Sequence, residues 1–178
     1  NASTTGVTIG RRCDNSVEFG GYLDEIRIVF GTAVYTSNFT VPTTRLTEIT
    51  NTKLLIHSNL SNGGSSYNTF TDSSTTGTTH SITASGAFHS TLYNVAENTV
   101  TLPAMTWPAS GKEFASYGAY FDGTGDYLSI ADHGEFDFTG TWTIDFWVRA
   151  ESIANYDGII SFDLSSSTDV TIGFGTDS

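Results

Sequence analysis

Hydrophobic and polar residues alternate along much of this chain with a period of two. In TWTIDFWV, residues 141–148, every second residue from Trp142 to Val148 is apolar, and polar residues including Asp145 lie among them. Successive side chains of a β-strand point to opposite faces of the sheet. The alternation therefore predicts a strand with one buried face.

A second strand is predicted over YLDEIRIV, residues 22–29. Regular alternation places Asp24 with the isoleucines on one face and Glu25 with Arg27 on the other, which predicts a charged outer face. Further short runs of strand composition lie between clusters of Gly, Asn, Asp and Ser, which form turns. These runs are Val7–Arg12, Lys53–His57, Gly118–Phe121, Tyr127–Ile130, Gly158–Phe162 and Asp169–Phe174. Many short strands without a helical stripe predict an all-β, antiparallel β-sandwich.

Two stretches lack a strand pattern. Residues 61–80 are polar and almost free of aliphatic side chains, so they cannot form a core of their own and are predicted to be loop or linker. Residues 94–116 contain Pro103 and Pro108, which argue against a central strand because proline has no N–H to donate to a neighbouring strand. We expect the second stretch to be a surface excursion.

Composition and charge narrow the function classes. The 178 residues carry 19 acidic side chains against 7 Lys and Arg, a formal net charge of -12, and such a chain repels the phosphate backbone of nucleic acid. No run has the length of a membrane span, so we expect no membrane insertion.

Cys13 is the single cysteine, so the fold must be stabilised by packing or by assembly with other chains. Because the chain begins with Asn1, we expect a piece of a larger protein.

Three segments carry a recognisable pattern. FDGTGDYLSIADHGEFDFTGTWTIDFWVRA, residues 121–150, resembles the opening strands of a laminin-G-like, concanavalin-type jelly roll, in which a D-G-x-x-D-Y turn precedes an E/D-F-W-V strand. GVTIGRRCDNSVEFGGYLDEIRIVFGTAVYTSNFTVPT, residues 6–43, is similar to the close of the same domain. NTKLLIHSNL, residues 51–60, resembles the start of another repeat. The resemblance implies a jelly-roll fold, and its closing pattern is common in phage tail-fibre repeats.

The order of these segments is inverted relative to that fold, because the closing strands come first. We divide the chain into closing strands at residues 1–48, a linker with an irregular opening segment at 49–116, and opening strands at 117–178. A tandem-array fragment, a subunit that exchanges strands with its neighbours and a circularly permuted domain all produce this order, and in the first two the sandwich is incomplete or shared. The resemblance implies that residues 22–30 pair with residues 117–130 of the same chain or of a neighbour.

The sequence offers no catalytic set, and we expect no enzymatic activity. Glycosidases need two carboxylates at a fixed separation, commonly supplied by a motif such as E-x-D-x-x-E, which this chain lacks. Asp24 and Glu25 are adjacent, so on a regular strand they point to opposite faces and cannot act on one bond. The four histidines, His57, His80, His89 and His133, show no H-x-H or H-E-x-x-H spacing and are predicted to be surface or core-edge residues and not metal ligands. No serine lies in a G-x-S-x-G motif.

Calcium is the one cofactor that the sequence suggests, because hard cations bind carboxylate and carbonyl oxygens gathered by turns. Asp122 and Asp126 flank a GTG turn. The resemblance implies that the strand at 22–29 lies beside the strand at 117–121, where Asp24 would approach Asp122, and laminin-G-like domains often hold a structural calcium in such loops. Turn aspartates bonded to backbone amides explain the same residues without an ion.

The leading hypothesis is a non-enzymatic virion surface or tail-fibre protein whose jelly-roll repeats serve assembly and the binding of host glycans. Its partners would be copies of itself or other virion subunits, and its location would be the virion surface or the extracellular space. The alternative is a carbohydrate-binding module or adhesin segment of a secreted bacterial protein. Loop aromatics usually recognise sugar in such sandwiches, and Tyr67, Trp107 and Tyr156 are the candidates.

Overall fold

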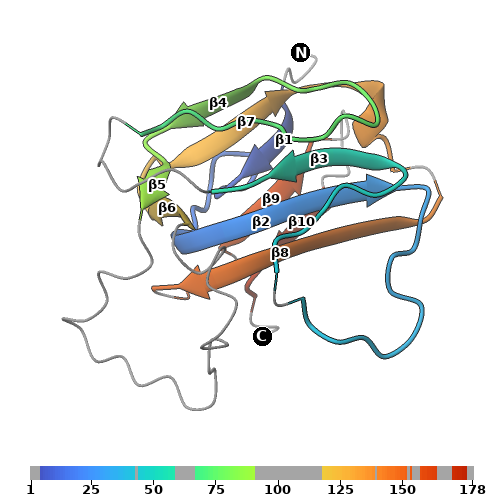
Figure 1. Ribbon diagram of the computed structural model, residues 1–178. Helices are drawn as coiled ribbons and strands as arrows, with labels where there is room; N and C mark the ends of the chain where they lie inside the picture. Colours follow the sequence, from blue (N-terminus) through green and yellow to red (C-terminus); the bar gives the residue numbers. More distant parts are fainter. Residues whose placement is uncertain are drawn as a thin grey trace.

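The computed structural model of the chain is an all-β sandwich of two antiparallel five-stranded sheets (Figure 1), which confirms the predicted fold class. The structure describes residues 5–42, 44–58, 67–90, 118–138, 140–151, 153, 157–163 and 170–175. The surface excursion predicted at 94–116 lies outside these ranges. No helix within them is long and apolar enough to cross a membrane.

The first sheet has β1 (Thr5–Ile9) at its centre. β1 lies between β7 (Tyr127–Ala131) and β9 (Gly158–Phe162). β4 (Ile82–Ser85) and β10 (Val170–Gly173) form the two edges of the sheet. All of these pairs are antiparallel. β1, from the N-terminal end of the chain, is bonded on both sides to strands from the C-terminal third.

The second sheet is organised around β2 (Gly20–Phe30). On one side of β2, β6 (Gly118–Asp122) pairs with its first half and β3 (Thr52–Ile56) pairs with its second half. β8 (Trp142–Ala150) pairs with β2 along its other side, and β5 (Phe88–Ser90) extends the sheet beyond β6. β2 is therefore bonded along both edges, which explains why it is buried along nearly its whole length.

The N-terminal segment meets the C-terminal part of the same chain in the second sheet. Tyr22 lies opposite Tyr120, and Leu23 lies opposite Ala119. The predicted pairing of residues 22–30 with residues 117–130 is thus confirmed at Tyr22 and Leu23, whereas Ile26–Val29 pair with β3 on this side. The described strands of the N-terminal, middle and C-terminal parts of the chain together form one sandwich.

The core between the sheets is rich in aromatic side chains. Phe19, Phe121 and Phe162 are fully buried, and the rings of Phe19 and Phe121 meet edge-on with centroids 6.0 Å apart. Full burial of one such side chain contributes about 1.5–3 kcal/mol to folding. The residues of β8 that pack against this core are Ile144, Phe146, Val148 and Ala150. Trp142, predicted on the same face, is instead 44% exposed and packs edge-on against Phe138.

A β-bulge in β2 breaks the alternation that the sequence predicts. Between Asp24 and Arg27, β2 advances three residues while β8 advances two, and Glu25 in the bulge has a φ of 51°. Leu23 and Ile26, on either side of the bulge, both belong to the core. The two residues between them therefore lie on the outer side together. The prediction that Asp24 and Glu25 point to opposite faces is wrong, because the extra residue shifts the side-chain period by one.

The polar segment 67–81 precedes β4 and contains no strand, as predicted for residues 61–80 where the structure describes them. The segment is fixed by Asp72, which is 4% exposed. Its Oδ1 accepts the backbone N–H of Leu55 at 3.1 Å, and its Oδ2 accepts that of His80 at 2.9 Å. One buried carboxylate thus joins this segment to β3.

Candidate functional site

The chain between β2 and β3, residues 31–42 and 44–49, forms a strap over the outer face of the second sheet (Figure 1). Beneath it, Asp145 of β8 accepts two hydrogen bonds from Arg27 of β2, at 2.6 and 3.0 Å. Tyr35 of the strap donates its hydroxyl to the same carboxylate at 3.1 Å, and Arg27 also donates to a strap carbonyl at 2.9 Å. These bonds fix the strap to the sheet at two points. The strap therefore covers the outer face of β2, which the sequence predicts to be charged.

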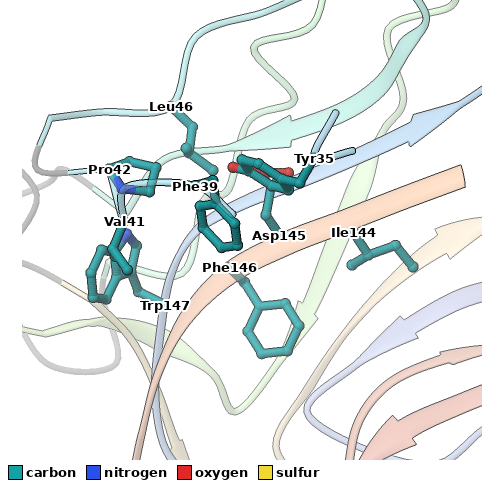
Figure 2. A pocket seen from close by; sticks show the side chains of 9 residues that line it. All are labelled: Tyr35, Phe39, Val41, Pro42, Leu46, Ile144, Asp145, Phe146 and Trp147. Atoms are coloured by element: carbon teal, nitrogen blue, oxygen red, sulfur yellow. The ribbon is translucent and has the colours of Figure 1, made fainter. Parts of the chain in front are cut away.

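A hollow of about 330 Å³ opens between the strap and β8. Its walls are Tyr35, Phe39, Val41, Pro42 and Leu46 of the strap and Ile144, Asp145, Phe146 and Trp147 of β8. Figure 2 shows the rings of Tyr35 and Phe39 together at one end of the hollow, and Val41, Pro42 and Trp147 gathered at the other. Its volume is at the lower end of the range for small-molecule sites.

The hollow presents aromatic rings on a fixed support. Phe39 is 56% exposed and stacks on Tyr35, with ring centroids 4.1 Å apart and planes inclined by 28°. Burial and the charge of Asp145 raise the pKa of the Tyr35 hydroxyl, so this hydroxyl remains a donor. Apolar ring faces next to a few fixed polar groups are typical of sites for small amphipathic ligands.

A buried pair of carboxylates lies beside the strap, at the bulge of β2. Glu25 is 1% exposed, accepts the backbone N–H of Leu46 at 2.7 Å and lies 2.9 Å from Nδ1 of His57. Asp24 is 5% exposed and accepts the backbone N–H of Ser58 at 3.1 Å. Burial, and then the charge of Glu25, raise the pKa of Asp24 to about 8. Carboxyl pKa values of this kind are common at catalytic sites, but these two groups are enclosed and give a substrate no access.

The three aspartates predicted as calcium ligands lie in two places. The register sets Asp122 opposite Gly20, so Asp24 lies four residues, roughly 13 Å, farther along β2. In the turn, Asp126 Oδ2 accepts the backbone N–H of Asp122 at 2.8 Å, and Asp122 Oδ1 accepts that of Thr124 at 2.7 Å. The structure thus brings Asp122 and Asp126 together through backbone amides, and Asp24 does not approach them.

The aromatic residues predicted to bind sugar are not those of the hollow. Tyr67 is 38% exposed and lies next to β5, where its carbonyl accepts the backbone N–H of His89. Trp107 and Tyr156 lie outside the described residues. Most of the strap residues in the wall of the hollow belong to YTSNFTVP, residues 35–42. The only indication of them in the sequence is a pair of aromatic residues and a proline just after a predicted strand. That signal does not reveal that the segment folds back onto β8.

A second group of polar side chains lies apart from the residues of the hollow. Among the described residues, His80, His133 and Glu135 each offer one ligand atom, and these atoms lie within 4.8 Å of one another. His80 precedes β4, whereas the other two belong to the turn around η3 (Gly134–Phe136). About fifty residues separate His80 from the turn in the sequence, so no metal-binding motif predicts this group.

Comparisons of the chain with protein-family models, with curated proteins and with solved structures found no match. The chain is an antiparallel β-sandwich of two packed sheets, with an aromatic hollow between the strap and β8.

Proposed function

We propose that this chain is a non-enzymatic, carbohydrate-binding β-sandwich of a virion surface or tail-fibre protein, and that the hollow binds a sugar ring of a host glycan. One observation carries the proposal: the stacked pair of Tyr35 and Phe39, with Phe39 exposed, stands beside the hydrogen-bonded carboxylate of Asp145. These groups rest on paired β-strands, which hold them in place before any ligand arrives.

The chemistry of the hollow suits a sugar. A sugar ring has apolar C–H faces, which pack on aromatic rings, and polar hydroxyls at its edge. Phe39 and Trp147 supply aromatic surface in the wall of the hollow. Asp145 lies in the same wall and is held in position by Arg27 and Tyr35. A hydroxyl of the ligand can thus bond to a carboxylate that is already oriented.

The charge of the chain favours a neutral glycan. With a formal net charge of -12, the protein repels sulfated or sialylated chains over distances of about a Debye length, roughly 8–10 Å in physiological salt. We therefore expect neutral hexose-containing oligosaccharides to bind better than acidic ones.

The family and the setting rest on sequence patterns. Residues 121–150 and 6–43 carry the laminin-G-like opening and closing patterns, and two packed antiparallel sheets are the architecture that such a domain requires. The adjacent carboxylates at the bulge, Asp24 and Glu25, are 5% and 1% exposed, which supports binding without catalysis.

Glycan-array binding tests the proposal with two matched variants. Phe39→Ala removes the exposed ring of the hollow, and Tyr67→Ala removes an exposed ring that lies elsewhere. We expect the unaltered chain to bind neutral glycans, Phe39→Ala to lose about fivefold to tenfold in affinity, and Tyr67→Ala to bind as the unaltered chain does, since stacking contributes about 1–1.5 kcal/mol per ring.

Three results would overturn the proposal. The first is an unaltered chain that binds no glycan on the array. The second is equal binding by Phe39→Ala, with thermal melts showing that the variant is folded. The third is release of new reducing ends from a bound oligosaccharide, which would make the protein an enzyme.

A further inference from the structure

A histidine nitrogen is buried without a hydrogen-bond partner just before β4. His80 is 8% exposed, and its Nε2 has no hydrogen-bond partner. This nitrogen lies 3.4 Å from Oε2 of Glu135, and Nδ1 of His133 lies 3.6 Å from the same oxygen. His80 Nε2 therefore makes no hydrogen bond of good geometry although it is buried next to a carboxylate oxygen, and a second imidazole nitrogen lies beside the same oxygen.

We propose that His80, His133 and Glu135 form a binding site for a divalent transition-metal ion of the zinc type. Tetrahedral zinc at its usual bond lengths separates neighbouring nitrogen and oxygen ligands by about 3.3–3.5 Å. The separations of 3.4 and 3.6 Å from Glu135 Oε2 are close to this range. All three ligand atoms lie within 4.8 Å of one another, and the His133 side chain, 41% exposed, has room to complete the approach.

The surroundings hold Glu135 in place as a ligand. Lys53 Nζ lies 3.1 Å from Glu135 Oε1, and the backbone N–H of Thr78 donates to Oε2 at 3.1 Å. Outer hydrogen bonds of this kind orient metal ligands. The backbone N–H of His80 donates to the buried carboxylate of Asp72 at 2.9 Å, which fixes the chain at His80.

The donor set selects the class of ion. Two imidazoles and one carboxylate suit zinc and its first-row neighbours, whereas calcium takes six to eight oxygen ligands. The ion replaces the 3.2 Å hydrogen bond by which His133 Nδ1 now accepts the backbone N–H of Glu135. It ties the segment before β4 to the turn before β8, so it braces the connection between the two sheets.

Zinc titration of the untagged, chelator-treated chain tests the site by isothermal calorimetry. His133→Asn removes the imidazole but keeps a side-chain oxygen that can accept the N–H of Glu135, because Asn is a good N-cap residue. The matched control is His57→Asn, which alters another histidine beside a carboxylate, Glu25. We expect one zinc ion per chain, a loss of at least about tenfold in affinity for His133→Asn, and unaltered binding for His57→Asn.

Cobalt gives a second readout that does not depend on a variant. Bound Co²⁺ should show the strong visible bands of a four-coordinate site, and Zn²⁺ should remove them while Ca²⁺ should not. Zinc bound well below one ion per chain would overturn the proposal, as would equal affinity losses for His133→Asn and His57→Asn. If His133→Asn does not fold in a thermal melt, Glu135→Gln replaces it in the same comparison.

Discussion

The buried carboxyl of Asp24 should make this protein less stable as pH rises. Its pKa rises from 3.8 to about 8 on folding, chiefly through burial. Between these values the unfolded chain releases a proton that the folded chain retains, so the free energy of unfolding falls by about 1.4 kcal/mol per pH unit. From pH 5 to pH 8 this amounts to as much as about 4 kcal/mol. Below about pH 4 the carboxyl is protonated in both states, and the effect disappears.

Asp24→Asn removes this dependence and keeps the local hydrogen bonds. Asp24 Oδ1 accepts the backbone N–H groups of Glu25 and Ser58, and the amide oxygen of Asn can accept both. Urea unfolding at pH 5, 6, 7 and 8, followed by tryptophan fluorescence, measures the difference between the variant and the unaltered chain. We expect this difference to grow with pH in favour of the variant by up to about 4 kcal/mol.

The control for this experiment is Asp122→Asn, which removes an exposed carboxylate from a turn and keeps the oxygen that accepts the N–H of Thr124. Comparing each variant with the unaltered chain at the same pH cancels the titration of groups that share no partner with the altered residue. A stability difference for Asp24→Asn that stays constant from pH 5 to pH 8 would refute the reasoning. So would an equal pH dependence in the control.

Two further predictions concern the strap and the pairing of the chain with itself. Asp145→Ala leaves the Arg27 guanidinium, whose side chain is 6% exposed, buried without its carboxylate, and urea unfolding should show a loss of about 3 kcal/mol; a loss well under 1 kcal/mol would mean that the pair adds little. Light scattering of the isolated chain should give 19.1 kDa, because β1 and β2 find their partners within it. A multiple of that mass would instead indicate exchange of strands between copies.

Local patterns in the sequence determined most of the strands and the fold class. Period-two alternation and turn residues predict β2, β8 and six further strands, because the direction of a side chain from a strand depends only on its position along it. The same patterns did not predict β4 or β5. These strands are four and three residues long, and apart from Ile82 and Phe88 they carry small or polar side chains, so their strand state depends on their neighbours β7 and β6.

The tertiary structure alone decided the register, the strap and both candidate sites. The bulge that places Asp24 and Glu25 on one side arises from the pairing of β2 with β8, and no local pattern records an extra residue that a distant strand imposes. Tyr35 becomes part of a hollow because Asp145, 110 residues away, accepts its hydroxyl. His80 meets Glu135 only where the two sheets are connected. Hydrophobic periodicity is a property of neighbours along the chain, whereas these sites depend on contacts that close long loops.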